Sequence, residues 1–302
     1  MARSPHYHQR YSRSLDQPNN SRESLNGLRE QSPNERASFS PALRYPDLDR
    51  YPQARKTYRL HDQQRYFLRQ SEIYTMAEAG KFRALSIDDL ERFVYSGDRE
   101  SMVRDFSNLE RQGLIRRISA RYPDPIRLVT LTRQGEKFMR GVLRESEQEI
   151  YFGLKKVREL RHDVALYEIY QAKAQEIEEE GGKIKRVVLD YELKRNLNRD
   201  LNRLNDRAAP LDDNKTKEEI GRKHSVPVIH GQYVVPDVRI EFEDRDGIES
   251  RVDLEYLTET YRHSDISGKA QAGFSLYASH EQAPRLHRVL DQHQIMTEIL
   301  SI

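Results

Sequence analysis

Apolar residues recur at helical spacing in two neighbouring segments of the chain, residues 86–94 and 99–112. Ser86 precedes the first segment and Ser96-Gly97-Asp98 separates the two, and these residue types commonly begin a helix or interrupt one. We therefore predict two short amphipathic helices joined by a tight turn. The apolar positions that define their buried faces are Ile87, Leu90, Phe93, Met102, Phe106 and Leu109.

Short β-rich runs follow the second helix, at residues 114–118 and 127–131. Gly113 is expected to end the helix, because glycine readily adopts the left-handed conformation found after helix C-termini. Between the runs, Tyr122-Pro123-Asp124-Pro125 suits the turn of a hairpin. Thr132 is then expected to cap a further helix.

With an earlier helix predicted over residues 62–79, this order is that of a winged helix-turn-helix. In such domains the second helix enters the major groove of DNA and the hairpin lies along the neighbouring backbone. We predict a DNA-binding domain over residues 59–141. Its expected DNA contacts are Arg99, Arg104, Ser107, Asn108 and Arg111 from the helix, and Arg116, Arg117, Arg121 and Arg127 from the wing, which should hold phosphates.

The charge of the chain supports this prediction locally. The whole chain has a formal net charge of only +2, whereas residues 111–140 contain eight basic and two acidic residues, a net charge of +6. Phosphate binding needs such a local excess. Because 33% of the chain is charged, the alternative explanation of this basic excess is an ordinary solvent-exposed surface with no DNA contact.

Composition limits the domain organisation and the class of protein. The length of 302 residues indicates two domains and a tail at about 150 residues per domain. The absence of cysteine excludes disulfides and CxxC-type zinc sites and fits a reducing, cytoplasmic location. There is no apolar run long enough to span a membrane and no apolar core of a secretory signal, so we expect no membrane association.

The segments that flank the predicted DNA-binding domain differ from it. Residues 1–58 contain ten basic and six acidic residues but few apolar ones, so we expect a disordered basic tail. After Thr132 the helical pattern continues through residues 142–160, which we predict to form a connecting helix or the arm of a homodimer.

The helical and strand-like segments of residues 161–302 follow the order expected of an α/β domain with a small mixed sheet. Together with the winged-helix half, this predicts an α+β chain. A helix should end at Gly181-Gly182. Further helices are expected at residues 192–204 and 281–300, a polar loop at 205–225, and strands at 183–189, 226–229, 233–242 and 248–257.

The last two of these strands bring acidic residues together. If Arg245, Asp246 and Gly247 form a three-residue hairpin loop with Gly247 left-handed, Asp237 lies opposite Glu255. Asp253 then shares a face with Glu255, because side chains alternate along a strand. Three converging carboxylates are what Mg²⁺ requires, so the sequence predicts a magnesium site here.

The order Pro236-Asp237, then Asp253-Leu254-Glu255, resembles the core of the PD-(D/E)XK nucleases. In that family the two acids hold a metal and the third position, usually lysine, activates or orients the attacking water. The resemblance implies a restriction-endonuclease-like domain with catalytic Asp237, Asp253 and Glu255, and with Lys269 from a following helix in place of the usual lysine. Glu192 would correspond to the acidic helix residue that some members add to the metal site.

The wider layout is similar to that of the replication-relaxation family of plasmids and integrative elements. Besides the winged-helix half and the acidic hairpin, the similarity rests on Leu160-Arg161-His162-Asp163 and Tyr191-Glu192. It implies a DNA-binding accessory protein in the replication or relaxation of mobile DNA. The implied partners are double-stranded DNA and the replication or relaxase machinery.

Two other functions stay open at this point. One is a winged-helix transcriptional regulator with a non-catalytic oligomerisation domain, and the other is an active metal-dependent endonuclease. Acids on an exposed hairpin face are ordinary, and Arg239 and Arg251 are able to pair with them across the strands. If these acids hold no metal, His162 and Asp163 are interpreted as residues of a helix N-terminus, and Lys269 as a surface residue.

Overall fold

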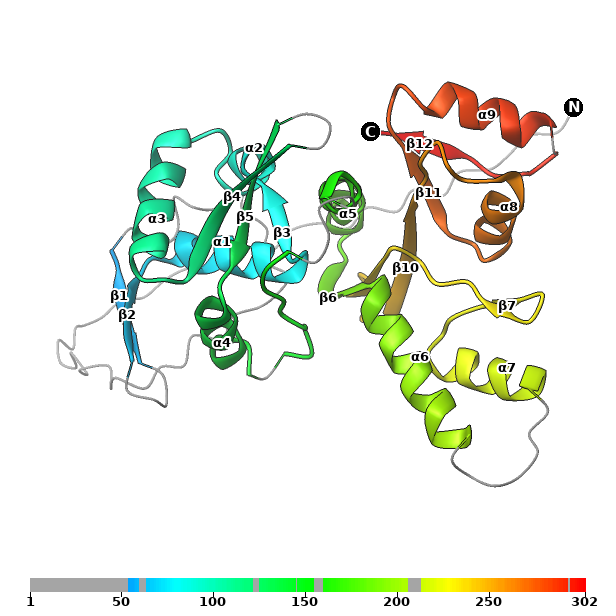
Figure 1. Cartoon of the computed structure of the whole chain (residues 1–302), viewed down its shortest axis with the longest axis horizontal. Coiled ribbons are helices and arrows are strands. Elements are labelled where there is room, and N and C mark those ends of the chain that lie inside the picture. Colours follow the sequence, from blue (N-terminus) through cyan, green and yellow to red (C-terminus); the bar gives the residue numbers. More distant parts are fainter. Residues whose placement is uncertain are drawn as a thin grey trace, which may run out of the picture. The chain divides into compact units, whose positions relative to one another are not determined.

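The computed structural model describes residues 54–59, 64–121, 125–144, 146–154, 160–205, 213–292 and 294–302 (Figure 1). This part of the chain is α+β and contains a mixed sheet, as predicted. Most of the predicted tail, residues 1–53, and residues 122–124 of the predicted hairpin turn lie outside the described residues. None of the described helices is both long and apolar enough to cross a membrane.

A hairpin opens the described chain where the sequence predicted tail and helix. It consists of β1 (Lys56–Arg59) and β2 (Arg65–Leu68), which pair antiparallel. The prediction of a helix from residue 62 was therefore wrong at its start. Tyr66 and Leu68 are buried while Arg65 and Phe67 are exposed, and this alternation has the period of a strand.

The next elements follow the predicted order of helices and strands, with one additional strand, β3, that the sequence did not predict. The side chain of Ser86 accepts a hydrogen bond from the Asp89 amide, and that of Asp98 accepts one from the Ser101 amide, so both predicted caps are confirmed. The elements are α1 (Gln70–Lys81), β3 (Ala84–Ser86), α2 (Ile87–Asp89), the π-helical turn η2 (Leu90–Val94), α3 (Arg99–Arg111), β4 (Ile115–Arg121), β5 (Pro125–Leu131) and α4 (Arg133–Val142).

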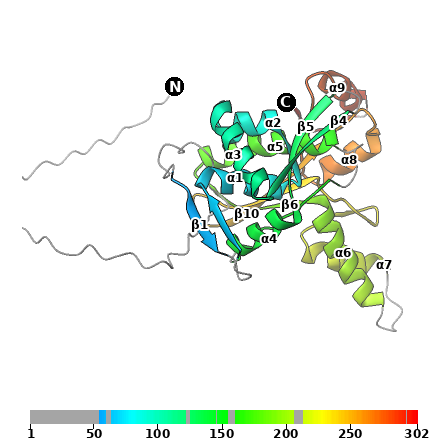
Figure 2. The ribbon, with the colours of Figure 1, turned by 60° about the vertical axis from the view of Figure 1, so that its left-hand side comes forward.

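Three of these strands form an antiparallel sheet in the order β3-β5-β4. Both views show β4 and β5 running together as a long pair (Figures 1 and 2). The side chains of Phe106 and Leu109 from α3 and Leu128 and Val129 from β5 are fully buried. The buried face of α3 is consequently part of a packed core, and the opposite face is exposed.

The predicted connecting helix is absent from the described part of residues 142–160. Helix α4 ends at Val142, and residues 146–154 form neither helix nor strand. The Tyr151 amide donates to the Gly80 carbonyl at 2.8 Å, and the Gly153 amide donates to the Leu131 carbonyl. Tertiary packing therefore overrides helical periodicity here, because these two amides donate to carbonyls outside the segment and not within a helical turn, while Ile150 is buried.

A five-stranded mixed sheet organises the second half, in the order β12-β11-β10-β9-β6. Strands β6, β9 and β10 pair antiparallel, whereas β10, β11 and β12 pair parallel. The elements are α5 (Leu160–Glu179), β6 (Lys183–Leu189), α6 (Asp190–Asn205), α7 (Asp213–Lys223), β7 (Val228–Ile229), β8 (Gln232–Tyr233), β9 (Val238–Glu243), β10 (Glu249–Tyr256), α8 (His263–Gln271), β11 (Ser275–Ala278), α9 (Ala283–Gln292) and β12 (Ile299–Ser301).

Two predictions for this half need correction. The polar segment at residues 205–225 contains helix α7, which lies beside α6 in both views (Figures 1 and 2). The closing helix ends at Gln292, and the chain finishes as the edge strand β12. In each case a partner distant in sequence decides the outcome: Ile220 of α7 is buried with Leu197 of α6, and β12 pairs with β11.

Candidate functional site

The acidic hairpin has the predicted register. Arg239 pairs with Asp253 and Val238 with Leu254, and Gly247 in the loop has a φ of +82°. Asp237, one residue before β9, is therefore placed opposite Glu255. Its amide donates to Glu255 Oε2 at 3.1 Å, so the predicted proximity of these two residues is confirmed.

Asp237 is held by groups from two other places in the chain. Its Oδ2 accepts a hydrogen bond from the Tyr256 amide at 3.0 Å and lies 3.2 Å from His162 Nε2. Burial by itself would lower the pKa of His162, but the hydrogen bond and negative charge of Asp237 outweigh it and raise that pKa. His162 thus belongs to the acidic cluster, beyond its predicted place at the start of a helix.

Glu255 is completely buried and lies beside Lys269 of α8. Lys269 Nζ is 2.6 Å from Glu255 Oε1, and the Tyr261 hydroxyl donates to the same oxygen at 2.7 Å. Burial and the nearby charge of Asp237 raise the pKa of Glu255 to about 7, although Lys269 opposes this shift. Lys269 also donates to the Val235 carbonyl, so its interpretation as a plain surface residue was wrong.

Asp253 shares a face with Glu255, but a different cation holds it. Arg239 donates to both of its carboxylate oxygens, at 2.7 and 2.9 Å. The same guanidinium donates to the carbonyls of His224 and Ser225 and is only 2% exposed. Asp253 therefore connects β10 to the segment after α7, as expected if arginine pairs with the acids across the strands.

Glu192 on α6 is also buried, and its recorded partners lie outside the cluster around Asp237. It accepts a hydrogen bond from the Tyr151 hydroxyl at 3.0 Å and forms an ion pair with Arg186. We name the group of Asp237, Glu255, His162, Tyr261 and Lys269 the hairpin cluster. The structure brings Lys269 into it, keeps Asp253 at its margin and gives Glu192 other partners.

The hairpin cluster does not fit magnesium held by all three predicted carboxylates. Both oxygens of Asp253 are taken by Arg239, and both oxygens of Glu255 accept hydrogen bonds from the protein. Among the described residues, no group of three or more histidine or acidic side chains is arranged to hold a metal ion. A magnesium site at Asp237, Asp253, Glu255 and Glu192 stays a prediction. It requires that the ion displace Arg239, Lys269 and Arg186 from these carboxylates.

The second candidate surface is the exposed face of α3. Arg104, Ser107 and Arg111 are exposed there, as predicted. The Arg104 guanidinium donates to Ser101 Oγ at 2.7 Å, and the Ser107 hydroxyl donates to the Val103 carbonyl. These contacts are local and exposed, so they leave the side chains within reach of a ligand.

Asn108 is the exception among the predicted contacts of α3. It is 7% exposed, and its amide nitrogen donates to the Phe67 carbonyl at 3.1 Å and to Glu72 Oε1 at 2.8 Å. A base contact would cost these buried hydrogen bonds. Asn108 as a DNA contact stays a prediction, and in the structure its side chain docks β2 onto α3.

The other predicted arginines fall into two groups. Three have acidic partners in the chain: Arg99 with Glu91, Arg117 with Glu110, and Arg127 with Asp88. Within the described chain the exposed Arg111, Arg116 and Arg121 have no acidic partner. The cations most available to phosphate therefore lie at the end of α3 and along β4.

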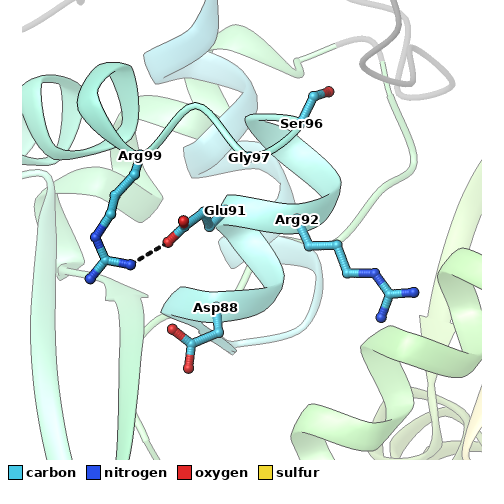
Figure 3. Close-up of a pocket in the computed structure, with 6 residues that line it drawn as sticks. All are labelled: Asp88, Glu91, Arg92, Ser96, Gly97 and Arg99. Atoms are coloured by element: carbon cyan, nitrogen blue, oxygen red, sulfur yellow. Dashed lines mark hydrogen bonds and ion pairs between the residues drawn. The ribbon is translucent and has the colours of Figure 1, made fainter.

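A shallow hollow of about 630 Å³ lies at the turn before α3 (Figure 3). Its charged lining consists of two acids and two arginines, and the Arg99–Glu91 ion pair joins one acid to one arginine. This balance favours no particular ligand charge. Its complete lining is Asp88, Glu91, Arg92, Ser96, Gly97 and Arg99.

Comparison with known proteins leaves these sites to be interpreted on their own geometry. No protein-family model, curated protein or solved structure matches this chain.

Proposed function

We propose that this chain is a double-stranded DNA-binding protein whose winged helix uses α3 in the major groove and the β4–β5 hairpin along the backbone. The observation that carries the proposal is that Arg111 at the end of α3, and Arg116 and Arg121 on opposite faces of β4, are exposed and have no acidic partner in the described chain. The helix order and the antiparallel sheet behind α3 suit this mode of binding.

The role we propose is that of an accessory factor in the replication or relaxation of mobile DNA. It rests on the resemblance of the acidic hairpin and the motifs at His162 and Glu192 to the replication-relaxation family. The hairpin cluster acts on DNA in this role only if DNA or a metal ion displaces Lys269 and His162 from its carboxylates. Binding is therefore the activity to test first.

The test is fluorescence anisotropy with a labelled duplex over a series of salt concentrations. Each arginine that neutralises a phosphate adds about 0.9 to the magnitude of the slope of log K against log salt. The double variant Arg116→Ala/Arg121→Ala should therefore bind more weakly and lower that slope by about 2.

Its matched control is Arg285→Ala/Arg288→Ala, which removes two exposed arginines from α9. This variant should bind as the wild type does. If the wild type fails to bind duplex DNA at low salt, the proposed function is wrong. Equal losses in both double variants would contradict the assignment of the wing, because binding would then follow overall charge.

A second candidate function is a metal-dependent endonuclease. The observation that favours it is the distance of 2.6 Å between Lys269 Nζ of α8 and Glu255 Oε1, since the resemblance to PD-(D/E)XK nucleases implies Lys269 as the catalytic lysine. The test is plasmid nicking in magnesium or manganese by the wild type and by Asp237→Asn, with duplex binding measured in parallel.

Nicking that Asp237→Asn abolishes while binding survives would support the nuclease. Binding without nicking by the wild type would instead support an accessory factor or a transcriptional regulator whose C-terminal half is not catalytic. In that case the cation-paired carboxylates serve the architecture of the sheet.

A further inference from the structure

The β1–β2 hairpin, which the sequence did not predict, has an outer face of unusual composition. In its antiparallel register Thr57 pairs with Phe67 and Arg59 with Arg65, so these four side chains share one face. The opposite face holds Tyr58 and Tyr66, whose rings pack against Phe138. The outer face therefore combines two arginines with an aromatic ring that is 54% exposed.

The hairpin is fixed to the C-terminal end of α3. The side-chain amide of Gln112 accepts a hydrogen bond from the Phe67 amide at 2.9 Å and donates to the Phe67 carbonyl at 3.0 Å. Asn108 donates to the same carbonyl. Three hydrogen bonds from the last turns of α3 thus hold β2 in place, and the outer face moves with the helix.

The two arginines on this face lie directly opposite each other. Like charges at a cross-strand pair destabilise a hairpin, because the side chains are close together on one face. Within the described chain, neither Arg59 nor Arg65 has an acidic partner. The pair is thus an exposed cationic site on the outer face, suited to binding an anion.

We propose that the outer face of the β1–β2 hairpin is a further DNA contact, in which Arg59 and Arg65 bind backbone phosphates beside the C-terminal end of α3. This inference rests on the proposed function and extends it. It assigns a role to Asn108 and Gln112 as positioning residues, which set the hairpin against the helix that enters the groove.

Charge favours DNA over a protein as the occupant of this face. Arg111 is exposed at the same end of α3, so three arginines without acidic partners in the described chain gather near the hairpin. A nucleic-acid backbone supplies closely spaced phosphates to such a group, and counterion release then adds to the affinity. Phe67 adds an exposed apolar ring to the face that carries Arg59 and Arg65.

The test measures duplex binding over a salt series for the full chain and for Arg59→Ala/Arg65→Ala. We expect weaker binding of the variant and a slope of log K against log salt that is lower in magnitude by about 2. The charge-retaining variant Arg59→Lys/Arg65→Lys should keep the wild-type slope. Circular dichroism melting checks that each variant is folded.

Control and contrary outcomes separate this inference from the proposed function. Arg285→Ala/Arg288→Ala on α9 again serves as the matched control. If the wild type binds and loses affinity in Arg116→Ala/Arg121→Ala but not in Arg59→Ala/Arg65→Ala, the hairpin inference alone is overturned. The inference would also be overturned if Phe67→Ser had the wild-type slope of log K against log salt but a different oligomeric state from the wild type. The outer face would then be a protein contact.

Discussion

At the scale of single residues, Glu255 is a side chain whose chemistry the fold changes strongly. Burial and Asp237 raise its pKa from an ordinary 4.5 to about 7, while Lys269 and Tyr261 bind its Oε1. A carboxyl group in such surroundings takes up a proton on folding at mildly acidic pH. Its ionisation state therefore contributes to stability as well as to any chemistry at the hairpin cluster.

This shift predicts a pH-dependent effect of Glu255→Gln on the free energy of unfolding. Because the pKa is higher in the folded state, the contribution of Glu255 to stability is present below about pH 4.5 and is lost as pH rises towards 7. The wild type should therefore lose stability relative to Glu255→Gln between pH 5 and pH 8, on the order of 2 kcal/mol. Urea unfolding at both pH values measures this difference.

His162 is present in both proteins, and so are the hydrogen bond and charge of Asp237, which raise its pKa against the effect of burial. The charge of Glu255 is the last of the causes that raise this pKa, so the comparison reports chiefly on Glu255 itself. A difference in stability that stays constant from pH 5 to pH 8 would show that Glu255 does not have the raised pKa.

Asp253→Ala should be strongly destabilising, which distinguishes an architectural role from a catalytic one. The substitution leaves Arg239 buried without its carboxylate, and loss of one partner of a buried pair costs about 3–5 kcal/mol. Denaturant midpoints of the wild type, Asp253→Ala and Asp237→Asn provide the measurement. Wild-type stability of Asp253→Ala would contradict the role given to the Arg239–Asp253 pair.

At the scale of elements, close packing between neighbouring elements constrains which residues are tolerated, as the first turn of α4 shows. Thr132 caps helix α4: its hydroxyl oxygen accepts a hydrogen bond from the Gly135 amide at 3.1 Å, and the hydroxyl donates to the Gly113 carbonyl. A Cβ atom at Gly135 would lie 2.0 Å from the Leu114 carbonyl oxygen. The first turn of α4 is therefore packed directly on the backbone that leads into β4.

Two glycine substitutions in helices should consequently act in opposite directions. Gly135→Ala should destabilise the protein by about 1–3 kcal/mol, because its Cβ overlaps a backbone carbonyl that is not free to move. Gly268→Ala in α8 meets nothing within 4 Å and should stabilise by up to about 1 kcal/mol through helix propensity. Thermal unfolding of both variants compares them directly, and a stabilising Gly135→Ala would contradict the close approach of α4 to β4.

At the scale of the whole molecule, the described parts of the two halves share one hydrophobic core. Tyr167 of α5 is fully buried and makes an edge contact with Phe82, with ring centroids 5.1 Å apart. It also contacts Phe93, with centroids 5.8 Å apart. The core continues from these rings to Val238 and Ile240 of the second sheet.

Tyr167→Ala should therefore weaken both halves together. Loss of a large buried aromatic side chain costs about 3–5 kcal/mol. Hydrogen exchange measured by mass spectrometry should show lower protection in α1 and in β9 by the same free energy, since a shared core unfolds cooperatively. Reduced protection of one element with full protection of the other would show that the halves unfold independently.

The predictions from sequence succeeded where the signal is local. Helix α5 ends at the predicted glycine pair, with Gly181 at a φ of +87°, and β6 has the predicted bounds. The register of β9 and β10 followed from a three-residue loop, Arg245 to Gly247, with Gly247 left-handed, because loop length and turn type set which residues oppose each other. These features depend on residues within a few positions of each other.

The sequence by itself determined most elements, the α+β class and the opposition of Asp237 and Glu255. Only the tertiary structure decided which distant partner each side chain meets: His162 lies beside Asp237 across 75 positions, and Asn108 binds the Phe67 carbonyl across 41. It also decided that residues 146–154 are not helical. The physical reason is that side-chain periodicity reports which face is buried, whereas partners distant in the chain are chosen by packing, which no local pattern encodes.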